Sequence, residues 1–120
     1  MSEDEEPAKL VRPVRWSALR ADEAERIIRE RAATSGRVGF SLHAFDRVEE
    51  RSITQVDAMS ILRQGNIEGA PELAANGTDW KVTVVRRMPG GREAGAVTVI
   101  YRPPSEELFV VTVEWMDTRR

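Results

Sequence analysis

The stretch FSLHAFDRVEERSIT, residues 40–54, predicts how the first half of the chain folds. Ser41 has the short polar side chain of a helix N-cap, whose oxygen can accept a hydrogen bond from a backbone N–H group of the first turn. Phe40 and Phe45 flank that cap at the N′ and N4 positions, where two apolar side chains form a hydrophobic staple. We therefore expect a short helix that begins at Ser41.

A second helix is expected directly after the first. Thr54 is a further N-cap candidate, and Asp57 stands three residues later as a shorter substitute for the glutamate of a capping box. Gly65 follows the last apolar residue at helical spacing and is the expected end of this helix.

Upstream of this stretch, apolar residues at helical spacing predict one more helix over residues 17–33. Ser17 can cap it, and residues 22–25 offer an alternative capping box slightly later. Residues 1–14 are acidic and then interrupted by proline, so we expect a flexible acidic arm there. Residues 15–120 are expected to form a single domain, because a chain of this length suits one hydrophobic core.

Downstream, the apolar period changes from about 3.6 residues to 2, which indicates strands. Residues 80–88, 96–102 and 108–115 are rich in valine, threonine, isoleucine and aromatic residues, and proline-containing turns connect them. A short strand near Ile67 is a further option, whereas residues 69–79 are expected to be a loop. The predicted fold class is α+β, with about three N-terminal helices packed on one face of a three- to four-stranded antiparallel sheet.

Alternation along these strands assigns their side chains to two faces. The face expected under the helices is apolar and consists of Trp80, Val82, Val84, Val97, Val99, Tyr101, Phe109, Val111, Val113 and Trp115. The opposite face carries hydroxyls and arginines and consists of Lys81, Thr83, Val85, Arg87, Thr98, Ile100, Arg102, Val110, Thr112 and Glu114. A mixed face of this kind is normal for a half-solvated sheet, and it also suits a ligand that carries phosphate groups.

Composition narrows the function classes. The chain has no cysteine and one histidine, which excludes disulfides and thiolate-bound zinc, so we expect neither a metal nor another cofactor. No apolar run approaches the roughly 18 residues of a transmembrane helix, and signal-peptide features are missing, so a cytoplasmic protein without membrane contact is expected. Outside the acidic residues 3–6, 18 basic groups stand against 16 acidic ones, which is not the strongly basic balance of a nonspecific nucleic-acid binder.

The helix motif SLHAFDRVEERSIT, residues 41–54, resembles the signature of a bacterial domain-of-unknown-function family, which runs roughly S-x-H-A-x-x-R-M-x-E-R-G-I-[ST]. That family continues with a short helix that ends in glycine and with a strand-rich half that ends in a Val-Thr-Val type of strand, here residues 111–115. The resemblance covers residues 37–117 in order. Val48 and Ser52 stand where the family usually has methionine and glycine, and neither position supplies chemistry.

The family is similar to the small metal-independent ribonucleases of the RelE, barnase, EndoU and colicin superfold. The resemblance implies a RelE/barnase-like domain that acts as an mRNA-interferase-like toxin of a toxin–antitoxin module, similar to MqsR-type toxins. Its substrate would be RNA, either free or presented by the ribosome. Its protein partner would be a cognate antitoxin, for which a zinc-finger protein is one candidate.

His43 is the first candidate for catalysis, because histidine titrates near neutral pH and can move a proton while a 2′-hydroxyl attacks the phosphodiester. Its alternative role is to bond a neighbouring loop and orient the start of its helix. Arg47, one turn later, can stabilise charge on the phosphate, or it can belong to a surface ion-pair ladder with nearby carboxylates. Glu114 on the last strand can serve as a second acid or base.

Four further residues are candidates for substrate binding. Arg51 lies on the same helix edge as the catalytic candidates and has a structural ion pair as its alternative role. Arg87, Arg102 and Thr112 are expected on the mixed face of the sheet, where arginine can bind phosphate oxygens in pairs. A register slip of one residue would exchange Arg87 with Arg86.

Two functions remain open at this point. A ribonuclease should gather His43, Arg47 and a sheet arginine around one open cleft, so that one phosphate is reached by all three. A non-catalytic protein-interaction module on the same fold should instead pair its arginines with carboxylates and tie the histidine to backbone or bury it.

Overall fold

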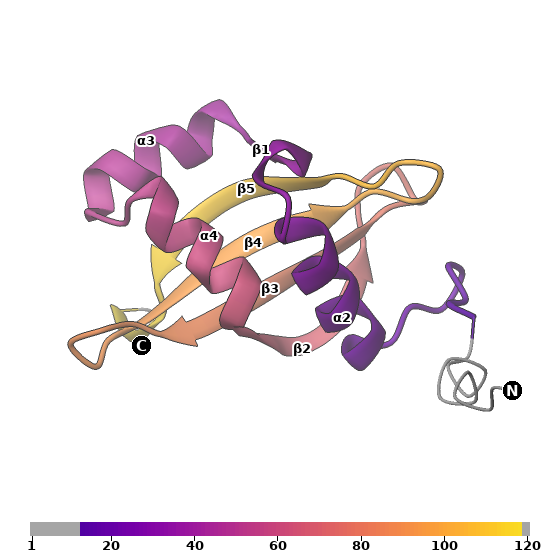
Figure 1. Ribbon diagram of the computed structural model, residues 1–120, viewed down its shortest axis with the longest axis horizontal. Helices are drawn as coiled ribbons and strands as arrows, with labels where there is room; N and C mark the ends of the chain where they lie inside the picture. Colours follow the sequence, from indigo (N-terminus) through magenta and orange to yellow (C-terminus); the bar gives the residue numbers. More distant parts are fainter. Residues whose placement is uncertain (1–12, 119–120) are drawn as a thin grey trace, which may run out of the picture.

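The computed structural model describes residues 13–118, so the acidic arm expected at residues 1–14 lies outside the described residues except for its last two positions. The described part forms three α-helices and five strands: α2 (Ala21–Ala32), β1 (Val38–Phe40), α3 (Leu42–Arg51), α4 (Gln55–Gln64), β2 (Asn66–Leu73), β3 (Trp80–Arg87), β4 (Glu93–Ile100) and β5 (Leu108–Trp115). The strands form one sheet in the order β1-β5-β4-β3-β2 (Figure 1). The predicted α+β class is confirmed.

The two helices predicted from residues 40–54 begin where their caps indicate. The Ser41 hydroxyl accepts a hydrogen bond from Ala44 N–H at 2.9 Å at the start of α3. Thr54 and Asp57 form a reciprocal capping box at the start of α4, with N–H···O distances of 2.9 and 3.0 Å. Between the two helices, Ser52 adopts the left-handed conformation with φ 60°, which ends α3 abruptly and allows α4 to start within three residues.

The first helix is shorter than predicted. α2 begins at Ala21 rather than Ser17, and residues 13–20 contain no regular helix. Its start is closed by the Glu23 carboxylate, which accepts a hydrogen bond from Arg20 N–H at 3.1 Å. Neither Ser17 nor the alternative box at residues 22–25 caps the helix, because the segment before it turns to bring Trp16 onto the core.

The sheet differs from the predicted three or four antiparallel strands, because it is mixed and has five. β1 pairs in parallel with β5 and is only three residues long, too short for a periodic pattern to reveal it. β2 pairs with β3 and extends through residues that were expected to form a loop. Its Gly69 and Pro71 disfavour a strand in isolation, and the ladder is irregular between Glu68 and Glu72.

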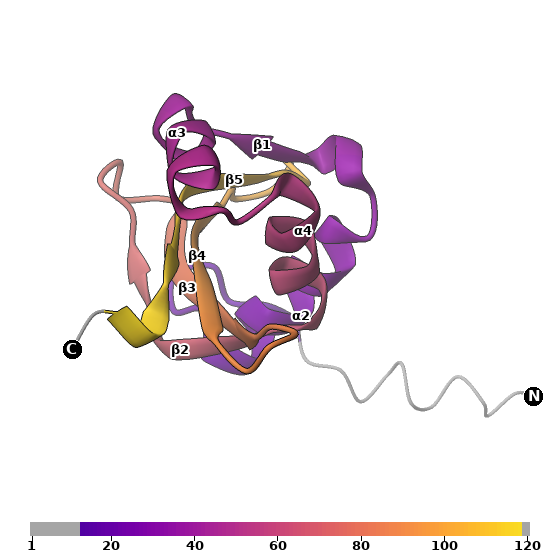
Figure 2. The ribbon, with the colours of Figure 1, turned by 90° about the vertical axis from the view of Figure 1, so that its left-hand side faces the viewer.

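The layers are simple. α2 and α4 cover one face of the sheet, and α3 lies along its β1–β5 edge (Figure 2). Within residues 13–118 the opposite face has no α-helix against it, and only the 3-10 helix η3 (Met116–Thr118) contacts it, where Met116 packs on Gly95. We call this opposite face the open face. The core lies between the sheet and the helices, and its largest fully buried side chains include Ile28, Ile61, Leu62, Val84 and Ile100.

The β4 strand is turned over relative to the prediction, whereas β3 alternates as expected. Residues assigned to the covered face are half-exposed on the open face: Val97, Val99 and Tyr101. Residues assigned to the mixed face are fully buried under the helices: Thr98 and Ile100. Both sides of β4 are apolar, so alternation alone does not determine which side the helices cover.

The β5 strand changes sides in its middle. Its first half is turned over like β4, so that Val110 is buried and Phe109 is half-exposed. A register shift between β4 and β5 adds one residue to β5 at Val111, and after this bulge Val113 is buried as predicted. Thr112 and Glu114 therefore lie on the open face as predicted. They do so because of the bulge, whereas the prediction assumed regular alternation along the whole strand.

We predict that Gly65→Ala destabilises the fold for a steric reason. A Cβ atom there would lie 2.6 Å from Ile61 O, 2.7 Å from Val85 O and 2.9 Å from Val84 Cγ1. Two of these atoms belong to backbone that cannot move aside, so the free energy of unfolding should fall by about 2 kcal/mol in urea denaturation. Gly36→Ala is the matched control, because no heavy atom lies within 4 Å of its Cβ position. Equal losses in the two variants would contradict the steric explanation.

Candidate functional site

The start of α3 is attached to the edge of β5. β1 covers the first half of that edge and ends at Phe40. Ser41 then continues the pairing: its N–H group donates to Val110 O at 3.0 Å, and its hydroxyl donates to Val111 O at 2.7 Å. Because the same hydroxyl also caps α3, Ser41 starts the helix and fixes it to the sheet.

The end of α3 is attached to the second half of the same edge. Arg51 Nη1 donates to Val113 O at 3.0 Å, and the indole N–H of Trp115 donates to Arg51 O at 2.7 Å. Two polar positions of the helix motif, Ser41 and Arg51, thus bond carbonyl groups of β5 beyond the end of β1. For Arg51 this is a structural role that the sequence left open.

Contacts on the two sides of α3 define its orientation. On one side Phe45 meets Phe40, with ring centroids 5.7 Å apart, and Phe40 packs against the core. On the other side Arg51 Nη1 lies 3.9 Å from a carboxylate oxygen of Glu114, which projects from the open face. Arg47 precedes Arg51 by one turn, and His43 precedes Arg47 by another. The flank with His43 and the two arginines therefore turns toward the open-face side of the sheet.

His43 is exposed on this flank, and no side-chain hydrogen bond to it is found within residues 13–118. It lines a shallow depression of about 400 Å³ together with Asp46, Arg47, Glu49 and Glu50. All five residues belong to α3. Arg47 forms an ion pair with Glu50, so its charge is already neutralised by a neighbour on the same helix.

The predicted site is only partly assembled. His43, Arg47 and Arg51 share one flank of α3, and Glu114 reaches that flank from the open face. Thr112 lies next to Glu114 on the same face of β5, two residues earlier. These are five of the seven residues that the sequence nominated, although the carboxylates beside His43 outnumber the one arginine that lines the depression.

The two sheet arginines lie at opposite ends of the sheet. Arg87 ends β3, and its Nη1 donates to Gly91 O at 2.8 Å in the β3–β4 turn. Arg102 follows the far end of β4, where its N–H group donates to Asp79 at 2.7 Å. The strand residues between them span roughly 25 Å, so one phosphate group cannot contact both. Neither arginine lines the depression at His43.

The predicted register of the two consecutive arginines on β3 is confirmed. Arg86 turns to the helix side and donates to the Ser60 hydroxyl at 3.1 Å. Arg87 is exposed on the open face. The two side chains therefore have separate surroundings, and only Arg87 is available on the open face.

The prediction missed an aromatic pair on the open face. Tyr101 and Phe109 are half-exposed, with ring centroids 6.4 Å apart, although both were assigned to the core. Phe109 pairs with Val99 on β4, and Val99 pairs with the exposed Lys81 on β3, so the three side chains form one row across the open face. On the other side of the row, Gly39 leaves room for the ring of Phe109.

A signal for this arrangement was present in the sequence of β4. Its small residues Ala94 and Ala96 are fully buried, and small side chains permit the close approach of a helix. The larger valines and Tyr101 are then left for the opposite face. This signal covers only part of the strand, because Ile100, which is larger than valine, is also fully buried on the covered side.

Within residues 13–118, no helix has both the length and the apolar character that crossing a lipid bilayer requires. In the same residues, no three His, Cys, Asp or Glu side chains gather closely enough to hold a metal ion. No protein-family model, curated protein or solved structure matches this chain. The resemblance of the helix motif to a bacterial family therefore stays a prediction.

We predict that Arg51 and Arg47 contribute very differently to stability. Arg51→Met should lower the free energy of unfolding by about 1 kcal/mol, because it removes the donor to Val113 O. Arg47→Met should change it by less than about 0.5 kcal/mol, because exposed ion pairs contribute little. Urea denaturation of both variants measures this difference. A larger loss in Arg47→Met would contradict the role assigned to Arg51 at the β5 edge.

Proposed function

We propose that this protein is a metal-independent endoribonuclease that holds single-stranded RNA on the open face and uses His43 for proton transfer. One observation carries the proposal. The α3 flank with His43 and Arg47 turns to the same side of the sheet as the half-exposed rings of Tyr101 and Phe109. A single strand of RNA could therefore contact both the aromatic pair and the histidine.

The open face has the features that single-stranded RNA uses. Bases stack on aromatic side chains without regard to sequence, and Tyr101 and Phe109 offer two neighbouring rings. Lys81 and Arg87 are exposed cations at different points along β3, so they would contact different phosphates of one chain. The net charge of −2 implies weak affinity for free RNA, which favours a substrate presented by the ribosome.

The proposed reaction moves two protons and needs no electron transfer. His43 takes the proton of a 2′-hydroxyl while that oxygen attacks the adjacent phosphorus. Arg47 leaves Glu50 and bonds the phosphate oxygens, whose negative charge grows in the transition state. The bond to the 5′-oxygen breaks, and this oxygen leaves with a proton donated by a water molecule, which the Glu114 carboxylate could orient. The products are a 2′,3′-cyclic phosphate and a 5′-hydroxyl end.

A cognate antitoxin is the protein partner that this proposal implies, with a zinc-finger protein as one candidate. The solvent side of α3 offers it an apolar contact, since Leu42 is 82 % exposed and Phe45 is 44 % exposed. Asp46 and Glu49 lie beside these side chains, so the partner surface should be apolar with a basic rim.

A non-catalytic interaction module is the second candidate, and a different observation favours it. Arg47 and Arg51 are both within ion-pair distance of carboxylates, Glu50 and Glu114. Arginines occupied in this way suit a docking surface better than a phosphate site. This candidate requires that the purified protein leaves RNA intact.

We predict cleavage of unstructured RNA by the purified full chain in the presence of EDTA. Gel analysis should show fragments that end in a 2′,3′-cyclic phosphate. His43→Gln should slow cleavage at least roughly 100-fold, the usual contribution of a positioned acid or base, without a change in the circular dichroism spectrum. Leu42→Ala is the control and should cleave at the wild-type rate, because its side chain is 82 % exposed on the solvent side of α3. Intact RNA with the wild type would favour the interaction module.

We predict separately that the aromatic pair contributes to RNA affinity. In a His43→Gln background, Phe109→Ala and Tyr101→Ala should each weaken binding of fluorescent single-stranded RNA by roughly 5- to 100-fold, the range for loss of one stacked base. Fluorescence anisotropy gives the dissociation constants. Leu42→Ala should bind as the parent does. If all three variants bind equally well, RNA does not lie on the open face.

A further inference from the structure

We infer that the protein has a second ligand site, which binds a phosphoryl group beside Arg31. The site is a cavity of about 410 Å³ between α2 and the β4–β5 connection, residues 101–107. It shares no lining residue with the depression at His43, and α2 lies on the covered side of the sheet (Figure 2). The inference therefore does not depend on the ribonuclease proposal.

Arg31 is a buried cation with no ion-pair partner in the described part of the chain. It is 7 % exposed, and no carboxylate within residues 13–118 lies at ion-pair distance from it. Its Nη1 donates to Tyr101 O at 2.8 Å and to Glu107 O at 3.0 Å. These two bonds fix the plane of the guanidinium group, but they neutralise none of its charge. Arginine is rarely buried to this extent without a counter-charge.

The remaining edge of this guanidinium group, Nε and Nη2, bonds no acceptor in residues 13–118. Neither nitrogen is fully buried, because every fully buried side-chain nitrogen of these residues has a hydrogen-bond partner. Since Arg31 lines the cavity, we take this edge to be the part that a ligand there would contact. Nε and Nη2 point in parallel and match two oxygens of one phosphate group. A purely structural role, in which Arg31 holds the β4–β5 connection, explains the two hydrogen bonds of Nη1. It does not explain why Nε and Nη2 have no acceptor among the described residues.

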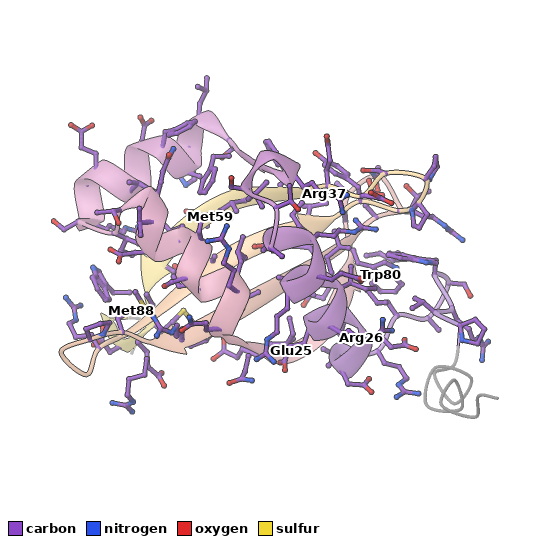
Figure 3. All side chains as sticks on the ribbon, viewed as in Figure 1. Glu25, Arg26, Arg37, Met59, Trp80 and Met88 are labelled. Atoms are coloured by element: carbon purple, nitrogen blue, oxygen red, sulfur yellow. The ribbon has the colours of Figure 1, made fainter. Side chains whose placement is uncertain are left out.

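Two more arginines line the same cavity (Figure 3 labels both). Arg26 comes from α2, and Arg37 comes from the turn before β1, where its Nη2 lies 3.0 Å from a carboxylate oxygen of Glu106. With Glu30, the cavity holds three cations and two carboxylates. Burial lowers the pKa of Arg31, and the charges of Glu106 and Glu30, which raise it, do not fully compensate. A phosphoryl dianion would offset the cost of burial better than a carboxylate monoanion.

The cavity has room for more than the phosphoryl group. The Trp16 ring lies 5.8 Å from Arg31 Cζ, and Val14, Ile27 and Pro103 add apolar walls. A volume near 400 Å³ is within the usual range for small-molecule pockets. A phosphorylated metabolite and the 5′-phosphate end of an RNA chain would present the same group to Arg31.

Isothermal titration calorimetry of the full chain with inorganic pyrophosphate, at constant ionic strength, tests the site. We expect saturable one-to-one binding. Arg26→Gln and Arg37→Gln should each weaken it roughly tenfold, the effect of losing one charge-assisted bond. Glu106→Gln should instead tighten binding, because it releases Arg37 and removes a negative charge. Arg29→Gln is the matched control: Arg29 is exposed on the same helix, lies outside the cavity, and should leave binding unchanged.

Arg31→Lys tests the guanidinium edge itself. It keeps the charge and loses the paired donors, so binding should weaken at least roughly tenfold. If this variant does not fold, the opposite effects expected of Arg37→Gln and Glu106→Gln still test the site. An absence of saturable binding to the wild type overturns the inference, and so do equal affinities of Arg26→Gln, Arg37→Gln and Arg29→Gln.

Competition identifies the source of the phosphoryl group. Displacement of pyrophosphate by a 5′-phosphorylated short RNA, but not by its 5′-hydroxyl form, would support an RNA end, whereas displacement by 5′-AMP alone would support a metabolite. His43→Gln should bind pyrophosphate like the wild type. Loss of RNA cleavage with retained pyrophosphate binding therefore separates the two sites.

Discussion

The free edge of β5 is the constraint on which much of this structure depends. β1 pairs with only three residues of an eight-residue strand, so the carbonyl groups beyond it need other donors. Ser41 and Arg51, at the two ends of α3, supply them. A bare edge would be open to pairing with other chains, and the helix removes that option. The same bonds set the rotation of α3 and thus the side to which His43 turns.

Arginine often serves this fold as a donor to backbone carbonyl groups. Within residues 13–118, five arginine side chains make such bonds: Arg29 to Gly65, Arg31 to Tyr101 and Glu107, Arg51 to Val113, Arg63 to Ala32 and Arg87 to Gly91. The long side chain and its several donors allow one residue to join elements that are distant in sequence. An arginine-rich composition is therefore a weak sign of nucleic-acid binding here. The informative arginine is Arg31, whose backbone bonds leave one edge of its charge unused.

The two apolar sides of β4 explain the character of the open face. Helices α2 and α4 cover the side with Ala94, Ala96, Thr98 and Ile100, and the side with Val97, Val99 and Tyr101 stays half-exposed. The bulge in β5 then returns Val113 to the core and leaves Glu114 on the open face near Arg51. The extra residue in β5 thus brings Glu114, a catalytic candidate on the sheet, close to the flank of α3. Without it, Glu114 would lie under the helices.

Local sequence patterns were enough to predict the starts of α3 and α4, the end of α4 at Gly65, the three long antiparallel strands and the separate sides of Arg86 and Arg87. These features rest on hydrogen bonds within four residues or on regular alternation, which a linear pattern records. Long-range contacts fix the other features: the parallel pairing of β1, the strand character of β2, the covered side of β4 and the place of the β5 bulge. Long-range contacts also attach Arg51 to the sheet, separate Arg87 from Arg102, and place Arg31 in the lining of a cavity. Each of these features depends on contacts between residues that are distant along the chain. Local spacing does not encode which of two apolar sides of a strand a helix will cover, nor which of many arginines will contact a distant element.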